Sequence, residues 1–268
     1  MVRGGSGRDR EPSRIDPLSN HHDRAAFAAG VEPNRVPDET AGTYLGRTHA
    51  VKRIRGTGEE TIRRRAEMIL GVDESLGRIM ATLDSLKLLD KTVIVFSSDN
   101  GFFFGEHGLT TERRLPYEES IRDPLLMRYP AKIPAGSRPA GLALTVDLAP
   151  TLLELADAPV GPHIQGRSLV PLFHGTPADW RQSVLVEFYT NEQPFPHLLD
   201  MDYRAVRTTR YKYIHWVKFP EMDELYDLKA DSLERHNLSN DPALASVKAG
   251  LKSDLGRLVL DAIGLGQR

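Results

Sequence analysis

Apolar positions recur with a helical spacing between residues 59 and 86 of this chain of 268 residues. The repeating side chains, three or four residues apart, are Ile62, Ala66, Ile69, Leu76, Met80 and Leu83. Such spacing places them on one face of a helix, so the sequence predicts an amphipathic helix here. Asp73 falls on the same face. Because an unpaired buried carboxylate is costly, we expect it to accept hydrogen bonds or to face a polar neighbour.

Two short apolar runs follow, and their length and composition favour buried strands. Residues 92–96 are β-branched and aromatic, and residues 125–129 form a second apolar run. The first run is typical of a central strand in a parallel sheet, which is buried on both faces. The charged segment 117–122 between them predicts a short helix whose side chains form local salt bridges.

The last third of the chain predicts a different architecture. Residues 183–189, 203–208 and 211–217 are aromatic and β-branched runs, and 208–210 suits a tight turn. We expect these runs to form a small antiparallel sheet, closed by an amphipathic helix at 241–262. The chain as a whole is therefore predicted to be α/β, with a small antiparallel sheet and a helix at its C-terminal end.

The organisation of the chain suggests three segments. Residues 1–55 are rich in Gly, Pro, Arg, Asp and His and show no sustained period, so we expect a poorly structured leader. His21 and His22 lie in this leader and are expected to be solvated. The rest is predicted to divide into an α/β unit at 56–175 and an α+β subdomain at 176–268.

Composition argues against several classes of function. The net charge of −2 does not indicate a broad basic surface for nucleic acid. No apolar stretch is long enough to cross a membrane, and the N-terminus lacks the hydrophobic core of a signal peptide. We therefore expect a cytoplasmic protein as the sequence stands, and a periplasmic or secreted one if an upstream export signal has been lost. The chain has no Cys, which excludes disulfides and thiolate metal sites.

A candidate metal site follows the first predicted strand. Asp99 offers a carboxylate and Asn100 a neutral amide oxygen, a combination that suits a hard cation such as Ca²⁺, Mg²⁺ or Mn²⁺. In open α/β sheets, ligands sit beyond the carboxyl ends of the strands. Asp-Asn-Gly by itself is more typical of a turn, so the metal interpretation depends on its context.

That context is a series of motifs in a fixed order. They are Phe96–Phe102, Gly105–Leu109, Tyr117–Arg122, Pro124–Pro130, Asp147–Leu153, Gln165–Leu169, Arg204–Arg207, Tyr211–Tyr213 and Glu224–Leu228. Together they resemble the sulfatase family of the alkaline-phosphatase-like superfamily, over about residues 60–255. The resemblance implies a partial alkaline-phosphatase-like core with a mostly parallel sheet, of which 56–175 would be the C-terminal part. It also implies metal-dependent hydrolysis of a sulfate ester, with Asp99 and Asn100 as metal ligands.

The chain departs from the sulfatase pattern at the nucleophile. Sulfatases carry a Cys-x-Pro-Ser-Arg type motif whose Cys, or in some members Ser, becomes a formylglycine, and this chain has no Cys. Arg10–Arg14 matches only the tail of that motif, and we interpret the match as coincidence because a guanidinium cannot become an aldehyde hydrate. No hydrophobic strand with paired acidic residues precedes residue 60. The sequence thus resembles the C-terminal portion of a sulfatase without the nucleophile half, and we expect it to be weakly active or inactive as this chain.

Two further roles follow from the resemblance. His107, between two glycines, is either a loop histidine hydrogen-bonded to a neighbour or a general acid toward the ester oxygen. The family's sulfate-binding Lys is replaced by Glu112-Arg-Arg114, so Arg113 or Arg114 would clamp the anion. The spacing from Asn100 to this position is about one residue longer than usual.

Three interpretations of function are therefore open. The first is a sulfatase-type sulfuric ester hydrolase, and the second is a phosphate or phosphonate ester hydrolase of the same superfamily, because one metal site serves both kinds of ester. The third is a non-catalytic remnant, which the missing nucleophile favours. Neither the particular ester nor the oligomeric state follows from the sequence.

Overall fold

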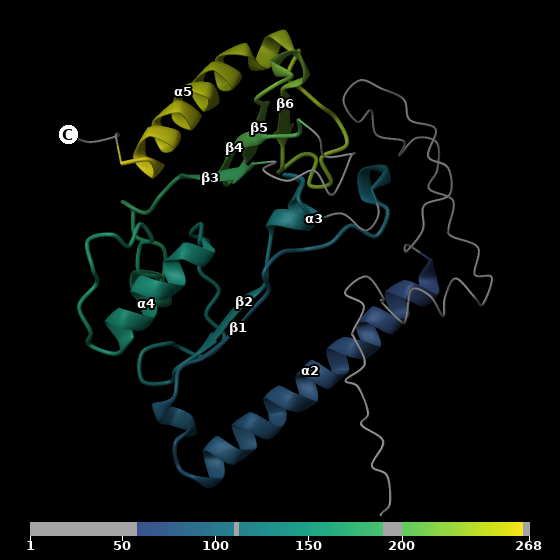
Figure 1. The fold of residues 1–268 in the computed structure, drawn as a ribbon. Coiled ribbons are helices and arrows are strands. Elements are labelled where there is room, and N and C mark those ends of the chain that lie inside the picture. The colour runs from purple at the N-terminus through teal and green to yellow at the C-terminus, as the bar shows by residue number, and fades with distance from the viewer. Residues whose placement is uncertain (1–57, 110–112, 190–199, 265–268) are drawn as a thin grey trace, which may run out of the picture.

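The computed structural model describes residues 58–109, 113–189 and 200–264, which form two sheets with helices around them (Figure 1). The first elements, with η for a 3₁₀ helix, are α2 (Glu59–Ser85), η2 (Leu89–Lys91), β1 (Ile94–Ser97), η3 (Glu106–Gly108), α3 (Glu118–Ile121), β2 (Leu125–Arg128), η4 (Thr145–Asp147), α4 (Leu148–Leu155) and η5 (Val170–His174). They are followed by β3 (Ser183–Phe188), β4 (Tyr203–Thr208), β5 (Tyr211–Trp216), η7 (Pro220–Met222), β6 (Glu224–Asp227), η8 (Pro242–Leu244) and α5 (Ala245–Ala262). The predicted leader, with Arg10–Arg14, His21 and His22, lies outside the described residues.

The helix predicted at 59–86 is confirmed as α2, which is 27 residues long and extends away from the C-terminal sheet (Figure 1). Only Thr61 of this helix is buried, and Met68, Ile69 and Leu70 are each more than half exposed. Asp73 is also exposed, so the cost expected for a buried carboxylate does not arise. Within the described residues, no helix combines the length and the apolar character needed to span a membrane.

The first predicted strand is confirmed as β1, but its partner runs in the opposite direction. β1 pairs antiparallel with β2, with Ser97 opposite Leu125. The mostly parallel sheet that the resemblance implied is not found among the described residues, where every strand pair is antiparallel. The chain leaves the end of β1 and returns beside that same end, where the Ser97 hydroxyl donates to the Pro124 carbonyl at 3.0 Å. An apolar run predicts burial but does not encode the direction of its neighbour.

The predicted C-terminal sheet and closing helix are both confirmed. The sheet has the order β3-β4-β5-β6 and is antiparallel throughout. Thr208 closes the turn between β4 and β5, because its hydroxyl accepts a hydrogen bond from Tyr211 N at 2.8 Å. α5 lies along one face of the sheet (Figure 1), and the core between them contains Val206, Tyr213, Leu225, Leu251 and Leu255.

The opposite face of this sheet is covered by the chain that follows β1. The buried residues of this second core are Phe103, Leu115, Tyr117, Met201, Tyr203, Ala205, Ile214, Trp216 and Tyr226. Side chains alternate between the two faces of a strand, so β4 and β5 supply residues to both cores. Because this core joins residues on both sides of position 175, the predicted division into 56–175 and 176–268 stays a prediction.

A third core lies beneath α4 and packs against the β1–β2 pair. Its buried residues are Leu155, Leu169, Leu172, Phe173 and Trp180. Asp147, which is completely buried, accepts two hydrogen bonds from the Arg181 guanidinium at 2.8 and 2.9 Å. A bidentate pair of this kind fixes geometry as well as charge. Nearby, a Cβ at Gly166 would lie 2.0 Å from the Val146 carbonyl oxygen, so this close approach requires glycine.

Leu225 provides a test of the core between the sheet and α5. Leu225→Ala is expected to lower the free energy of unfolding by about 2–5 kcal/mol, because it removes apolar contacts and leaves a cavity. Leu233→Ala is the matched control, since Leu233 is exposed, and should change it by less than about 0.5 kcal/mol. Urea unfolding followed by the fluorescence of the two buried tryptophans measures both variants. Equal effects of the two substitutions would contradict the core described above.

Candidate functional site

Asp99 and Asn100 lie directly beyond the end of β1, where the sequence predicted a metal site. Asp99 is exposed, and its Oδ1 accepts a hydrogen bond from Asn100 N at 3.0 Å. The side-chain nitrogen of Asn100 donates to the Gly101 carbonyl at 2.9 Å, so the donor end of this amide is already occupied. The arrangement leaves oxygen atoms, the donors that hard cations prefer, for a ligand.

A second carboxylate, Asp123, lies close to this pair and was missed by the sequence analysis. Burial raises the pKa of the Asp123 carboxyl, and the charge of Asp99 adds to the effect. The Oδ1 atom of Asp123 is buried, and among the described residues it has no hydrogen-bond partner. Buried polar atoms without partners are rare, and a cation between the carboxylates would satisfy this one. The donor set therefore fits a hard cation.

Gly101 ties this loop to α3. Its N–H donates to the Ser120 carbonyl at 2.8 Å. A Cβ at this position would lie 1.8 Å from the Glu119 carbonyl oxygen, a distance that no side chain tolerates. The close approach of two backbones therefore requires glycine here, and it holds the loop with Asp99 and Asn100 against the helix that carries Glu118 and Glu119.

The three phenylalanines after Gly101 alternate between core and surface. Phe103 is completely buried beneath the loop, whereas Phe102 and Phe104 are half-buried, with ring centroids 5.3 Å apart. The guanidinium of Arg65, from α2, lies 4.1 Å from the centroid of the Phe102 ring. The aromatic run thus anchors the loop on one side and contacts α2 on the other.

His107 is held among aromatic and acidic side chains. Its Nε2 lies 3.3 Å from Glu119 Oε2, and its ring stacks on Tyr117 with centroids 4.0 Å apart. Burial tends to raise the pKa of the Glu119 carboxyl, but the hydrogen bond with His107 brings it below its usual value. The structure thus places the predicted histidine in a hydrogen bond with a neighbour, and its role as a general acid stays a prediction.

Arg113 and Arg114 follow the segment 110–112, which with Glu112 lies outside the described residues. Arg113 is exposed and Arg114 is half-buried. The Arg113 carbonyl accepts a hydrogen bond from the Ser120 hydroxyl at 2.5 Å, which ties this segment to α3 as well. The anion-clamp role of the two arginines stays a prediction.

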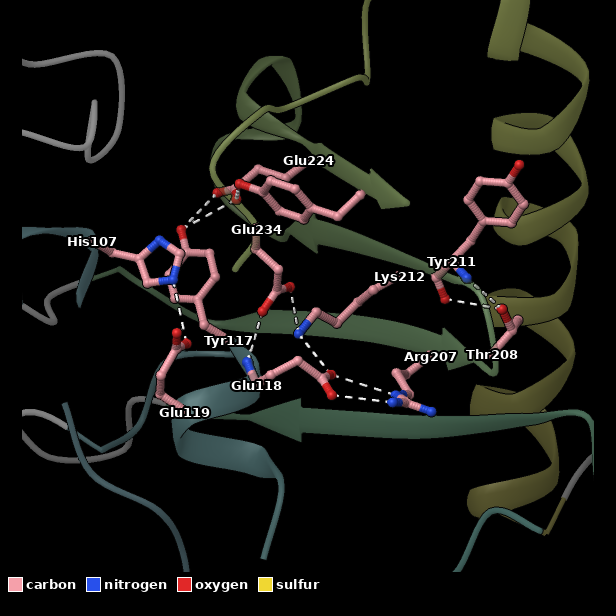
Figure 2. Close-up of polar contacts among 11 residues, drawn as sticks. His107, Tyr117, Glu118, Glu119, Arg207, Thr208, Tyr211, Lys212, Glu224 and Glu234 are labelled. Atoms are coloured by element: carbon pink, nitrogen blue, oxygen red, sulfur yellow. Dashed lines mark hydrogen bonds and ion pairs between the residues drawn. The ribbon is translucent and has the colours of Figure 1, made fainter. Parts of the chain in front are cut away.

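A buried ionic network lies next to His107, and Figure 2 shows its members. Lys212 and Glu234 are completely or almost completely buried, and the Lys212 ammonium lies 2.5 Å from Glu234 Oε1 and 3.2 Å from Glu118 Oε1. Arg207 contacts the other oxygen of Glu118 at 3.1 Å. The salt bridges expected to be local to 117–122 therefore reach instead to the C-terminal sheet.

The carboxylates of this network titrate differently. Burial tends to raise the pKa of Glu118, but Lys212 and Arg207 together bring it below its usual value. Burial raises the pKa of the Glu234 carboxyl to about 7, although Lys212 acts in the opposite direction. One feature of the sequence pointed to this network, a lysine between two tyrosines on a predicted strand, but none pointed to its partners.

Three residues form a second cluster that could hold a metal ion. Potential ligand atoms of His107, Glu119 and Glu234 all lie within 4.8 Å of one another. Each already has a partner, since Glu119 pairs with His107 and Glu234 accepts from Glu118 N at 2.7 Å. Lys212 also contacts Glu234, so a cation bound there would face a positive charge. The oxygen donors of Asp99, Asn100 and Asp123 suit a hard cation better.

Lys212 offers a test of the ionic network. Lys212→Met is expected to lower the free energy of unfolding by about 3–5 kcal/mol, because it leaves buried carboxylates without their cation. Lys218→Met is the matched control, since Lys218 pairs with Asp200 on the surface, where ion pairs contribute little. Urea unfolding at neutral pH measures both. A Lys212→Met protein as stable as the wild type would show that the network does not support the fold.

Two family models match the chain, each over more than half of it. The Sulfatase model matches residues 17–158. The model for the C-terminal part of N-sulphoglucosamine sulphohydrolase matches residues 105–261. The second match includes His107 and the whole C-terminal sheet, so the segments that build the site are all within sequences typical of sulfatases.

Individual relatives of this chain are sulfatases and other members of the alkaline phosphatase superfamily. An N-acetylglucosamine-6-O-sulfatase from Bacteroides thetaiotaomicron is 42% identical over 173 residues, which are 63% of this chain and 30% of the relative. A multifunctional alkaline phosphatase superfamily protein from Trinickia caryophylli is 35% identical, over 67% of this chain and 36% of the relative. A choline-sulfatase from Rhizobium meliloti is 35% identical, over 69% and 35%. The chain thus spans about a third of the length of these relatives.

Solved structures agree with these matches. An enzyme in complex with its substrate D-glucosamine-2-N,6-O-disulfate has a TM-score of 0.69 at 38% identity, over 74% of this chain and 40% of that one. The phosphonate monoester hydrolase of Agrobacterium radiobacter has a TM-score of 0.65 at 28% identity, over 72% and 40%. Sulfatases are generally metal-dependent. The chain therefore belongs to the sulfatase family, with the alkaline-phosphatase-like fold.

Proposed function

We propose that this chain supplies part of the active site of a metal-dependent sulfuric ester hydrolase. The observation that carries the proposal is the group of oxygen donors at the end of β1, where Asp99 and Asn100 lie beside the unpartnered oxygen of Asp123. Asp99 and Asn100 would hold Ca²⁺, or Mg²⁺ or Mn²⁺ in its place. When bound, such an ion polarises the oxygens of an oxyanion ester.

The proposed substrate is the sulfate ester of an amino sugar. Two similarities support this class: the relative with 42% identity is an N-acetylglucosamine-6-O-sulfatase, and the related structure at 38% identity holds a sulfated glucosamine. A sulfate group presents several oxygens to the site, and an arginine side chain can grip two of them at once. Arg113 or Arg114 would take this role, replacing the usual Lys.

His107 would act as proton donor to the leaving oxygen of the ester. Its Nε2 already lies 3.3 Å from Glu119 Oε2, and this carboxylate would stabilise the protonated imidazole. The chain has no Cys from which a formylglycine could form, and Arg10–Arg14 lies outside the described residues. We therefore propose that this chain alone hydrolyses little or no ester.

A second candidate function is the hydrolysis of phosphate or phosphonate esters. The likeness to a phosphonate monoester hydrolase, at 28% identity and a TM-score of 0.65, supports it. Both kinds of ester present a tetrahedral oxyanion, and neither an arginine clamp nor a hard cation chooses strongly between them. A non-catalytic remnant is the third possibility, and the kinetic test below separates it from the two enzymes.

Calcium binding tests the proposed metal ligands. Because few ligands come from this chain, its Ca²⁺ affinity should be weak, with a dissociation constant on the order of 10⁻⁴–10⁻³ M. Asp99→Asn should weaken binding further, whereas Asp84→Asn, which changes an exposed carboxylate on α2, should leave it unchanged. Isothermal titration calorimetry measures all three proteins. Micromolar or tighter binding by this chain, or unaltered binding by Asp99→Asn, would contradict the proposal.

Turnover tests the proposed reaction. Protein expressed from the complete gene should hydrolyse N-acetylglucosamine-6-O-sulfate and an aryl sulfate faster than the corresponding aryl phosphate. The measurement is kcat/KM for each ester, with the His107→Gln protein as control. A preference for phosphate or phosphonate would favour the second function. Absence of any turnover, in a protein shown to be folded, would favour the non-catalytic remnant.

A further inference from the structure

A largely buried carboxylate, Glu224, lies at the start of β6 and receives hydrogen bonds from three aromatic side chains. The Tyr226 hydroxyl donates to Oε2 at 2.5 Å, and the Trp216 indole nitrogen donates to Oε1 at 2.9 Å. The Tyr117 hydroxyl lies 3.1 Å from Oε2 and 3.3 Å from Oε1. All of these groups are donors, so the carboxylate is well satisfied and its orientation is fixed.

Tyr117 connects this carboxylate to His107, as Figure 2 shows. The hydroxyl of Tyr117 contacts Glu224. Its ring stacks against the imidazole of His107, with centroids 4.0 Å apart and an angle of 13° between the planes. The ring of Tyr117 is itself held edge-on by Phe103 at 6.2 Å and by Tyr226 at 6.3 Å. Tyr117 is only 7% exposed, so it has little freedom to move.

The backbone of His107 does not by itself explain why the imidazole lies where it does. His107 has a φ of 55°, a left-handed conformation that costs energy in a residue other than glycine. Its neighbours Gly105 and Gly108 also have positive φ values, of 122° and 70°. A strained residue between two glycines keeps one orientation only where its surroundings impose it. The flat ring of Tyr117 is one such constraint, and the hydrogen bond with Glu119 is another.

A role in packing alone would not require the carboxylate. A phenylalanine at 117 facing an apolar residue at 224 would fill the same space, and replacing buried polar groups by apolar ones of similar size is often neutral or stabilising. The cluster instead retains a carboxylate with three donors. The hydrogen bond to Glu224 fixes the hydroxyl end of the Tyr117 ring, in addition to the edge-on contacts that hold the ring itself.

We propose that Tyr117 and Glu224 are positioning residues for His107. Glu224, on the C-terminal sheet, fixes the hydroxyl of Tyr117, and the ring of Tyr117 then sets the plane of the imidazole, whose Nε2 faces Glu119. The effect of these two residues on catalysis rests on the proposed function, in which His107 donates a proton to the ester. The C-terminal sheet thereby takes part in building the active site, because Glu224 lies on β6.

The first measurement is independent of activity and uses nuclear magnetic resonance of the full chain. The ring protons of His107, identified by their loss in His107→Gln, should be shifted upfield because the imidazole stacks on Tyr117. Tyr117→Leu removes the stacking ring and should abolish that shift. Tyr117→Phe and Glu224→Gln keep the shape of the side chains but remove or weaken the hydrogen bond between positions 117 and 224. Each should reduce the upfield shift of the His107 ring protons.

Tyr213→Phe is the matched control. Tyr213 is at least as buried as Tyr117, and its hydroxyl also donates to a buried carboxylate, that of Asp223 just before β6, but it faces α5 rather than the site. Its substitution should leave the His107 signals unchanged. If Tyr117→Phe and Glu224→Gln also leave them unchanged, Glu224 does not position the ring and the proposal is overturned.

The second measurement uses the enzyme assay with protein from the complete gene. Tyr117→Phe and Glu224→Gln should each lower kcat by about tenfold or more, with KM changed by less than about twofold, because a misplaced proton donor affects the transition state more than substrate binding. Tyr213→Phe should keep the wild-type kcat. Urea unfolding of each variant confirms that the comparison is made between folded proteins.

The two measurements separate this proposal from the proposed function. If the His107 signals respond as expected but the wild type hydrolyses none of the esters, the positioning of the ring is supported and the proposed function fails. If the wild type is active and Tyr117→Phe and Glu224→Gln keep its kcat, the proposed function stands and the positioning role is overturned.

Discussion

Lys212 carries a charge into the interior of this protein, and the placement of the candidate site depends on how that charge is compensated. Its partners lie far apart in the sequence: Glu118 begins α3, whereas Glu234 follows the last strand. A buried ammonium needs both, because the loss of solvation is recovered only where the geometry of the ion pairs is good. The network therefore holds α3 against the C-terminal sheet, and with α3 come Tyr117, Glu119 and the loop that carries His107.

The same contact explains why the site draws on distant parts of the sequence. The loop with Asp99 and Asn100 is held to α3 by the hydrogen bond from Gly101 to Ser120. The ion pair between Glu118 and Arg207 holds α3 to the C-terminal sheet. Tyr117 reaches Glu224 across the aromatic core. One short helix of four residues, α3, therefore brings three groups together. These are the oxygen donors around Asp99, the His107–Glu119 pair and the ring of Tyr117.

Local patterns were sufficient to predict much of the fold. The helical spacing from Ile62 to Leu83 predicted α2, and the aromatic and β-branched runs predicted β3, β4 and β5. The amphipathic pattern at 241–262 predicted the helix that covers them. The direction of β2 relative to β1 was not predictable, because it depends on where the intervening chain returns. Asp99 and His107 were identifiable because they stand in recognisable motifs. Lys212 and Glu224 also stand in such motifs, but the roles of Asp123, Lys212 and Glu224 were not identifiable, since they arise from contacts that join residues far apart in the sequence.

The close approach at Gly101 has a consequence for how this part of the molecule can vary. One added carbon atom would meet the backbone of Glu119 at 1.8 Å, and neither backbone can yield without moving the other. Such a displacement would be transmitted as a rigid shift to the oxygen donors on one side and to the imidazole and its acidic partner on the other. The loop and the helix therefore move together. A larger residue at position 101 would displace both Asp99 with Asn100 and His107 with Glu119.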